Sequence, residues 1–212
     1  MNRDGIKKAL LDLRNDFFIE LENRPENFSE EYVRSVFLNR TLELFGWNLS
    51  NTNEVIQEKK ITDQTARKNL LEIDSSHIKP DYQLLDRGIL KLYLDAKNVY
   101  PSFLDDQSTA FQIRSYGWSS RLNFSMVSDF QHFRVYDTSF KPSYDIPSDF
   151  KTITFSIDDL INEFDIYSQF IDRNKIKSGN WELDKFSLEI EEGYKKTFDS
   201  DFISLINDLQ IN

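Results

Sequence analysis

The stretch from Lys79 to Tyr100, KPDYQLLDRGILKLYLDAKNVY, limits the possible folds of this chain more than any other segment. Two runs rich in Leu, Ile and Tyr flank the tripeptide Asp86-Arg87-Gly88, which is the pattern of a β-hairpin. Asp81 stands at the head of the first run, and Asp95 stands near the end of the second. Acidic residues of a hairpin normally lie on its solvated turn, so two carboxylates within predicted strands require an explanation.

Helices and further strands are predicted on both sides of this hairpin. Apolar residues at helical spacing predict helices over Ile6–Leu21, from Ser29 to Gly46, over Ala110–Trp118, after Ser156 and over Phe198–Leu209. Short apolar runs predict strands over Glu54–Lys59, Phe124–Asp129, Phe133–Asp137 and Thr152–Phe155. The polar stretch Thr62–Asn69 is expected to be a loop or an irregular insertion.

The order of these elements predicts an α/β fold, with a mixed central β-sheet flanked by helices and a C-terminal helical extension. The hydrophobic pattern of the sequence changes near Thr138, where a linker-like segment with two prolines follows the last predicted strand pair. Residues 1–140 are therefore expected to form the core domain. Residues 141–212 are expected to form a helical extension or connector that packs on this core.

The composition of the 212 residues excludes several classes of protein. Hydrophobic residues make up 39% of the chain, with 18 Phe, 9 Tyr and 3 Trp, which is enough for a sizeable core. The absence of Cys excludes disulfide bridges and cysteine-based zinc sites. No apolar run approaches the roughly 18 residues that span a bilayer, and the first residues do not form a secretory signal. We expect a cytoplasmic location and no membrane association.

The formal net charge of −10 argues against unaided binding of nucleic acid, because non-specific affinity for DNA comes from Lys and Arg that neutralise phosphates. A metal-dependent phosphodiesterase nevertheless needs clustered carboxylates, and a few local basic residues or a neighbouring domain can bind the phosphates. The charge thus leaves two alternatives open, an acidic interaction protein and a nuclease.

Asp81, Asp95 and Lys97 form the strongest candidate for a chemical site. Side chains alternate between the two faces of a strand, so Asp95 and Lys97 point the same way, and the Ala96 carbonyl can lie near the same ion. Two carboxylates and a carbonyl are the hard oxygen ligands that Mg²⁺ prefers. A neighbouring ammonium can stabilise developing negative charge or orient a metal-bound water. The exposed polar face of a hairpin is the structural alternative for the same three residues.

The region resembles the PD-(D/E)XK nuclease superfamily, with Pro80-Asp81 as the PD and Asp95-Ala96-Lys97 as the (D/E)XK. From about Glu30 to Asp137, the chain resembles the amino-terminal endonuclease domain of type IIG restriction–modification enzymes. It resembles the amino-terminal region of type I restriction R subunits more distantly. The family usually has Glu where this chain has Asp95, which shortens that arm by one methylene group.

Three further features carry this resemblance. The segment SEEYVRSVFLNRTLELFGW matches a family helix that bears a Glu and an Arg, here Glu30 and Arg34, and ends in a phrase like Leu-Gly-Trp. Glu58 ends the predicted strand that precedes the PD. Gln112 and Tyr116 match a Gln-x-x-x-Tyr on the helix after the Asp-x-Lys.

The resemblance implies a Mg²⁺-dependent endonuclease that cleaves double-stranded DNA and accepts Mn²⁺ as a substitute. The implied metal ligands are Asp81, Asp95, the Ala96 carbonyl and Glu30. The implied catalytic residues are Asp81, Asp95, Lys97, Glu58 and Gln112, and the implied DNA contacts are Tyr116, Arg114 and Arg121. Lys97 would position or activate the attacking water.

The resemblance also implies partners beyond DNA. Type IIG proteins continue into a methyltransferase and a target-recognition domain, whose Asn-Pro-Pro-Tyr and glycine-rich motifs are missing from this sequence. We therefore expect these domains in cis or in trans, together with transient pairing of two copies of the chain. Base recognition then belongs to the separate domain.

Alternatives remain for the function and for single residues. The fold can serve as a non-catalytic DNA-binding or assembly module, and cleavage of single-stranded DNA is a variant of the same activity. Glu30 is also favoured at a helix start by the helix dipole. Ordinary packing, solvation or exposed helix ends can explain Glu58, Gln112, Tyr116, Arg114 and Arg121. The two histidines, His77 and His132, have no partner motif and receive no role.

Overall fold

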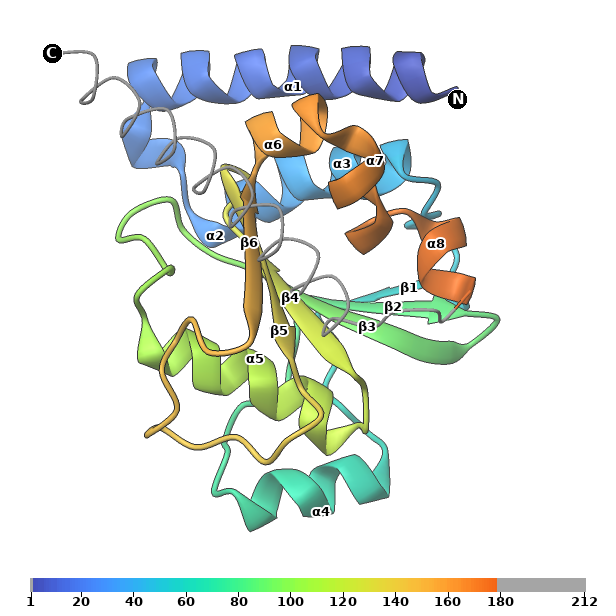
Figure 1. Ribbon diagram of the computed structural model, residues 1–212, viewed down its shortest axis with the longest axis vertical. Coiled ribbons are helices and arrows are strands. Elements are labelled where there is room, and N and C mark those ends of the chain that lie inside the picture. Colours follow the sequence, from blue (N-terminus) through green and yellow to red (C-terminus); the bar gives the residue numbers. More distant parts are fainter. Residues whose placement is uncertain (1, 179–212) are drawn as a thin grey trace, which may run out of the picture. The chain divides into compact units, whose positions relative to one another are not determined.

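A six-stranded mixed sheet forms the centre of the computed structural model, which describes residues 2–178 (Figure 1). The strands follow one another across the sheet in chain order: β1 (Val55–Gln57), β2 (Tyr82–Asp86), β3 (Ile89–Ala96), β4 (Phe124–Ser128), β5 (His132–Asp137) and β6 (Thr152–Ser156). Neighbouring strands are antiparallel except β3 and β4, which run parallel. A parallel pair needs a crossover, and α5 (Gln107–Ser119) supplies it.

Helices flank this sheet, as predicted for an α/β fold. α5 packs on β3, β4 and β5, and α4 (Gln64–Glu72) packs on α5. On the other side in Figure 1 lie α1 (Arg3–Asn23), α3 (Asn39–Leu44) and α6 (Ile157–Asn162). The other helical segments of the described residues are η1 (Pro25–Asn27), α2 (Glu30–Tyr32), the π-helix η2 (Val33–Leu38), α7 (Phe164–Tyr167), η3 (Ser168–Phe170) and α8 (Arg173–Ser178).

The strands β2 and β3 form the predicted hairpin. Tyr82 pairs with Leu94, and Gly88 in the turn has a φ of +82°, a conformation that glycine adopts without steric cost. Asp81 precedes Tyr82, and Asp95 follows Leu94. The register of the hairpin therefore sets these two acidic residues opposite each other at the end of the hairpin away from its turn.

A continuous helical run from Glu30 to Leu44, made of α2, η2 and α3, carries the second group of candidate residues. It begins at the predicted Ser29 cap. Its π-helical middle pairs the Asn39 N–H with the carbonyl of Arg34, five residues earlier. The Tyr82 hydroxyl donates to the same carbonyl at 3.0 Å. The π segment thereby ties this helical run to the start of β2.

An aromatic cluster fixes the other side of the same helical run. Phe17 of α1 packs against Phe28, Phe37 and Phe130, with ring centroids 4.8 to 5.1 Å apart. All four side chains are buried. Phe130 lies in the turn between β4 and β5, so the cluster joins α1, the helical run and the sheet. Such rings bury large apolar areas and contribute strongly to core stability.

The prediction of a loop over Thr62–Asn69 is wrong, because α4 begins at Gln64. The Asp63 carboxylate accepts a hydrogen bond from the Ala66 N–H at 2.8 Å and so caps the helix. Ala66 and Leu70 are buried in the same apolar cluster as residues of α5 and β3. Two buried side chains among polar neighbours are enough to hold a short helix once tertiary contacts exist.

The sheet continues beyond the expected domain boundary at residue 140. The predicted edge strand is confirmed as β6, which pairs with β5. The predicted helix start is also confirmed, since Ser156 and Asp159 form a capping box at α6. Met1–Gly179 forms one compact unit, and the division at residue 140 stays a prediction. The helix predicted over Phe198–Leu209 lies outside the described residues.

Arg114 on α5 was expected to contact DNA phosphates, but its side chain is 0% exposed. Its guanidinium donates hydrogen bonds to the carbonyls of Pro147 at 3.1 Å, Ser148 at 3.4 Å and Phe150 at 2.6 Å. It also lies 5.2 Å from the ring centroid of Tyr136. Arg114 therefore holds the segment 147–150 against the core, and no phosphate has access to it.

Replacing Arg114 by Ala is expected to lower the free energy of unfolding by about 2–4 kcal/mol, because carbonyls lose their donor and a cavity remains. Urea unfolding of the purified chain measures this change. The control is Arg121→Ala, because Arg121 is exposed beyond the end of α5. Its expected effect is within about 0.5 kcal/mol. Equal losses for the two variants would contradict the structural role of Arg114.

Candidate active site

Asp81 and Asp95 meet where β2 begins and β3 ends. The Asp81 N–H donates to Oδ1 of Asp95 at 3.2 Å, and the Ala96 N–H donates to Oδ2 of Asp81 at 2.7 Å. Each carboxylate thus accepts a hydrogen bond from the opposite strand. Asp95 is 3% exposed, whereas Asp81 is partly exposed. The two acids therefore lie side by side at the edge of the core.

Lys97 brings the positive charge of this cluster. Its Nζ donates to Oδ2 of Asp95 at 2.7 Å and to Oε1 of Gln112 at 3.3 Å, and it lies 3.8 Å from Oε2 of Glu30. Its backbone N–H donates to the Ser128 carbonyl at 3.0 Å, which extends the parallel pairing of β3 and β4. The cluster therefore joins the hairpin, α5 and the start of α2.

The local charges and the burial perturb these groups strongly. Burial raises the pKa of Asp81 to about 7, and the neighbouring charge of Asp95 adds to this rise. Burial also raises the pKa of Glu30, against the opposing effect of Lys97. Burial disfavours the Lys97 ammonium, but the combined attraction of Asp95, Glu30 and Asp81 outweighs it, so the pKa of Lys97 is raised. Lys97 is therefore an ammonium at neutral pH. Its charge does not fully offset the effect of burial on the carboxyl groups of Asp81 and Glu30, whose pKa values stay raised.

The donor set fits a divalent cation of the Mg²⁺ type. Two carboxylates already lie side by side, and burial together with the charge of Asp95 raises the pKa of Asp81, an effect that a cation would oppose. Within residues 2–178, no group of three or more His, Cys, Asp or Glu side chains could hold a metal ion. A cation here would thus rest on Asp81 and Asp95, with the Ala96 carbonyl and water completing its shell.

Glu58 lies beside the cluster but points its carboxylate at basic residues. It is 3.0 Å from Nη2 of Arg34 and 3.1 Å from Nζ of Lys79. Lys79 and Arg34 lower the pKa of Glu58. Only the Glu58 backbone touches the acidic pair, since its N–H donates to the Asp81 carbonyl at 2.8 Å. The structure therefore does not bring the Glu58 carboxylate together with the carboxylates of Asp81 and Asp95.

Arg34 is a residue of this region that the sequence reasoning left without a role. Its side chain is 8% exposed and contacts Glu31 at 2.7 Å as well as Glu58. Its positive charge also opposes the rise in the pKa of Asp81 and of Glu30. The spacing of Glu30 and Arg34 on one helix was the signal that could have identified it. Arg34 thus balances the negative charge on the helical side of the cluster.

Gln112 and Tyr116 lie one turn apart on α5 and act together. The Gln112 amide donates to the Tyr116 hydroxyl at 3.0 Å, while its carbonyl accepts from Lys97. Tyr116 is 1% exposed and packs against Tyr93 with ring centroids 5.7 Å apart. Tyr116 therefore orients Gln112 from within the core, and the packing alternative fits it better than a DNA contact.

The remaining predicted residue, Arg121, lies apart from this cluster. It lies two residues beyond the end of α5 and nine positions after Gln112, which corresponds to about 13 Å along a helix axis. Its contact with DNA stays a prediction. His77 is close enough to the cluster to feel the charge of Lys97, which together with burial lowers the pKa of His77. The Nδ1 atom of His77 is buried without a hydrogen-bond partner among the described residues.

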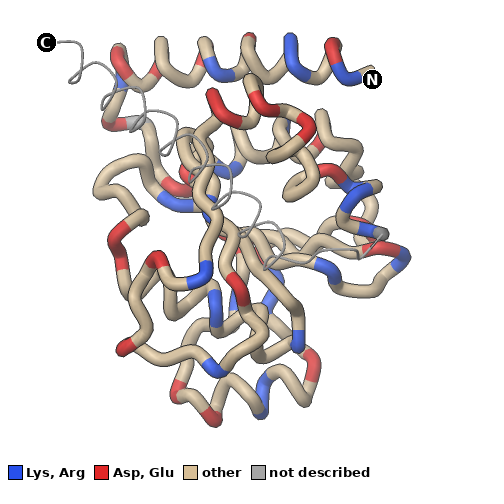
Figure 2. Tube along the Cα trace, viewed as in Figure 1, with Lys and Arg blue, Asp and Glu red and all other residues tan. Residues whose placement is uncertain are grey.

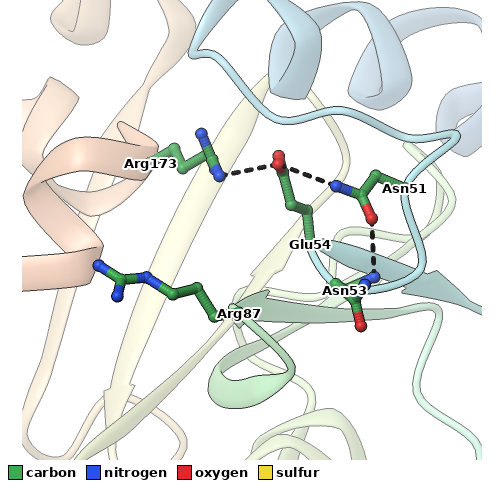
Figure 3. A pocket seen from close by; sticks show the side chains of 5 residues that line it. All are labelled: Asn51, Asn53, Glu54, Arg87 and Arg173. Carbon is green, nitrogen blue, oxygen red and sulfur yellow. Dashed lines mark hydrogen bonds and ion pairs between the residues drawn. The ribbon is translucent and has the colours of Figure 1, made fainter.

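A separate polar pocket of about 320 Å³ lies near the turn of the hairpin (Figure 3). It is lined by Asn51, Asn53, Glu54, Arg87 and Arg173. Glu54 accepts from Asn51 at 3.1 Å and from Arg173 at 2.8 Å, so its charge is already paired. None of the predicted site residues lines this pocket.

The helices of residues 2–178 include none that is long and apolar enough to cross a membrane.

One comparison with known proteins bears on this site. Over 190 residues, the chain is 23% identical to the type II restriction enzyme and methyltransferase RM.Eco57I of Escherichia coli. The match covers 89% of this chain but only 19% of that protein, so the chain spans about a fifth of its length. No family model matches the chain, and no solved structure matches it significantly. The similarity supports a relationship to restriction enzymes.

Replacing Asp81 by Asn is expected to stabilise the metal-free protein increasingly as the pH rises from 5 to 8. The pKa of Asp81 is about 7 in the folded protein, whereas its ordinary value, which applies to the unfolded chain, is 3.8. The folded state therefore binds this proton more tightly, and the stability of the wild type falls as the pH rises towards 7. Asn keeps an acceptor for the Ala96 N–H without the buried charge.

Thermal unfolding in a chelator measures the effect, which should reach on the order of 2 kcal/mol, or about 4–8 °C in Tm, at pH 8. Asp12→Asn is the control, since Asp12 is exposed on α1. A gain for Asp81→Asn that is the same at pH 5 and pH 8 would show that the carboxyl of Asp81 has an ordinary pKa.

Proposed function

We propose that this chain is the Mg²⁺-dependent endonuclease part of a restriction–modification system and hydrolyses phosphodiester bonds of double-stranded DNA. The observation that carries this proposal is the convergence of Asp81, Asp95 and Lys97 at one end of the hairpin. The similarity to a restriction enzyme and methyltransferase over most of the chain supports it independently. The Pro80-Asp81 and Asp95-Ala96-Lys97 motifs agree with an assignment to the PD-(D/E)XK nucleases.

The proposed mechanism gives each group of the cluster one task. Asp81 and Asp95 hold the cation, and the Ala96 carbonyl and Glu30 complete its environment directly or through water. When bound, Mg²⁺ would supply Lewis-acid chemistry, which would polarise the scissile phosphate and lower the pKa of a nearby water. Lys97 is an ammonium at neutral pH, so it donates hydrogen bonds and positive charge to the reacting groups and does not accept the proton.

Two neighbours fix Lys97 for this task. Gln112 accepts from its ammonium, and Tyr116 in turn accepts from the Gln112 amide. The rotamers of a long flexible lysine are thereby restricted before substrate arrives, which lowers the entropic cost of positioning it. Gln112 is thus a positioning residue of the proposed site.

The relative contains both a restriction enzyme and a methyltransferase, and this chain matches only a fifth of it. We therefore propose a type IIG-like arrangement, in which a methyltransferase and a target-recognition domain act in cis or in trans with this chain. Two copies of the nuclease would pair transiently to cut both strands. Sequence specificity would come from the target-recognition domain, because base edges have to be read in the grooves.

A second candidate is a non-catalytic DNA-binding or assembly module with the same fold. The contact that favours it is the ion pair of Lys97 with Asp95 at 2.7 Å, which partly neutralises the cluster without any cation. The net charge of −10 also favours a role other than unaided DNA binding. Metal binding and DNA cleavage separate this candidate from the nuclease.

Plasmid cleavage tests the proposed activity. The full chain should nick or linearise DNA with Mg²⁺ or Mn²⁺ and not with a chelator, and Asp81→Ala and Lys97→Ala should lower the rate by about 100-fold or more. Asp12→Ala and Lys141→Ala are matched controls, because Asp12 is exposed on α1 and Lys141 pairs with Glu72 at the surface. Equal cleavage by all five proteins would indicate a contaminating nuclease.

Metal binding tests the cluster without DNA. A cation that binds only the folded protein raises its stability, by about 2.7 kcal/mol when its concentration is 100 times the Kd. Mn²⁺ or Mg²⁺ should therefore raise the Tm of the wild type and of Asp12→Ala, but not that of Asp81→Ala. An equal rise in all three would place the bound cation elsewhere on the chain.

A further inference from the structure

We infer that Lys59 and Lys60 bind the DNA backbone directly beside the proposed cleavage site. This inference rests on the proposed nuclease function and goes beyond it, because it assigns the contact with the substrate to two lysines that no motif includes. Their segment runs from Glu58 to Ile61, just after the edge strand β1. The chemical group it would bind is a backbone phosphate next to the one that is cleaved.

Backbone hydrogen bonds fix this segment against the start of β2. The Glu58 N–H donates to the Asp81 carbonyl at 2.8 Å, and the Ile61 N–H donates to the Ile78 carbonyl at 2.8 Å. The Lys59 carbonyl accepts from the Gln83 side chain at 2.7 Å. Ile61 is also buried in the core, so both ends of the segment are anchored.

This pairing places the two lysines close to the carboxylate cluster. Glu58 hydrogen-bonds to residue 81, and Ile61 hydrogen-bonds to residue 78. Between these two bonds, Lys59 lies opposite Pro80, and Lys60 lies opposite Lys79. Paired strands are about 5 Å apart and rise about 3.3 Å per residue, which puts the Cα of Lys60 about 8 Å from that of Asp81. A lysine side chain can span most of that distance, so its ammonium can reach a phosphate adjacent to the cleaved one.

The ammonium groups of Lys59 and Lys60 form no ion pairs with the described residues, unlike the basic groups of neighbouring residues. Both residues are exposed, and neither has an ion-pair partner within residues 2–178. In contrast, Lys79 pairs with Glu58, and Arg34 lies between Glu58 and Glu31. Glu58, the acid next to Lys59 in the chain, is therefore already paired with other basic residues.

A local basic segment is what a DNA-cleaving domain of this charge requires. Figure 2 shows acidic and basic residues interspersed along the described trace, and the whole chain carries −10. A phosphate backbone can approach the acidic cluster only where positive charge is near it. Lysines supply such contact as point charges without reading the base sequence, which suits a domain whose specificity lies elsewhere.

The experiment compares two lysine pairs in the full chain. Lys59→Ala/Lys60→Ala removes the proposed contact, and Lys7→Ala/Lys8→Ala removes two adjacent lysines of α1 as a control with the same change in net charge. Fluorescence anisotropy with a short DNA duplex in a chelator, where no cleavage occurs, gives the affinity at several salt concentrations. Circular dichroism and Tm establish that both variants are folded.

We expect the Lys59/Lys60 variant to bind about tenfold more weakly at moderate salt, with a slope of log affinity against log salt reduced by about 2. The control should keep the wild-type affinity and slope. Unchanged affinity and slope in the Lys59/Lys60 variant, or equal losses in both variants, would overturn the inference while the wild type still cuts plasmid DNA. A wild type that neither binds nor cuts DNA would remove the proposed function, and the inference with it.

Discussion

Two carboxylates share one partly buried position at the open end of a hairpin, and the rest of the site depends on how their charge is balanced. Each accepts a backbone N–H from the opposite strand, which holds them together in spite of their repulsion. Burying like charges this close is costly unless a proton, a cation or a basic side chain compensates them. The raised pKa of Asp81 is the visible result of that constraint.

The surrounding elements each bring a compensating group to the same place. β3 continues past Asp95 to Lys97 because its parallel pairing with β4 extends by one more hydrogen bond, to the Ser128 carbonyl. The α5 crossover that this parallel pair requires passes Gln112 over the ammonium. The π-helical segment brings Arg34 to the other side, tied to β2 by the Tyr82 hydroxyl. The fold thus brings two positive charges, those of Lys97 and Arg34, to the acidic pair, and Gln112 holds the Lys97 ammonium.

The sequence allowed the hairpin and its acidic pair to be predicted, because strand alternation and turn chemistry act locally. A regular register continued from the turn at Asp86-Arg87-Gly88 would place Asp81 opposite Leu94. A β-bulge between Leu84 and Leu85 shifts the pairing by one residue and brings Asp81 next to Asp95. The direction of long side chains, in contrast, could not be predicted from the sequence. The strand β1 ends at Gln57, one residue before Glu58, and the Glu58 carboxylate pairs with Arg34 and Lys79. Such competition among charged partners depends on tertiary distances, which periodicity does not contain.

The same limit explains two errors elsewhere in the chain. The resemblance implied that Arg114 contacts DNA, and an exposed helix end was the alternative, but the irregular segment 147–150 offers its guanidinium several carbonyl acceptors. The helix α4 was missed because only Ala66 and Leu70 interrupt its polar sequence as buried residues. In both cases a partner far away in the sequence decides the local structure, as tertiary context overrides propensity.

The geometry of the acidic pair would also link binding of the proposed cation to proton release. Oδ1 of Asp95 accepts the Asp81 N–H, and Oδ2 accepts Lys97. On Asp81, Oδ2 accepts the Ala96 N–H, whereas Oδ1 takes no hydrogen bond from the described residues. The free oxygen therefore belongs to the group whose pKa lies near 7, so the proposed cation would compete with a proton for Asp81. Cation affinity should then rise with pH across the neutral range, although Lys97 keeps its charge throughout.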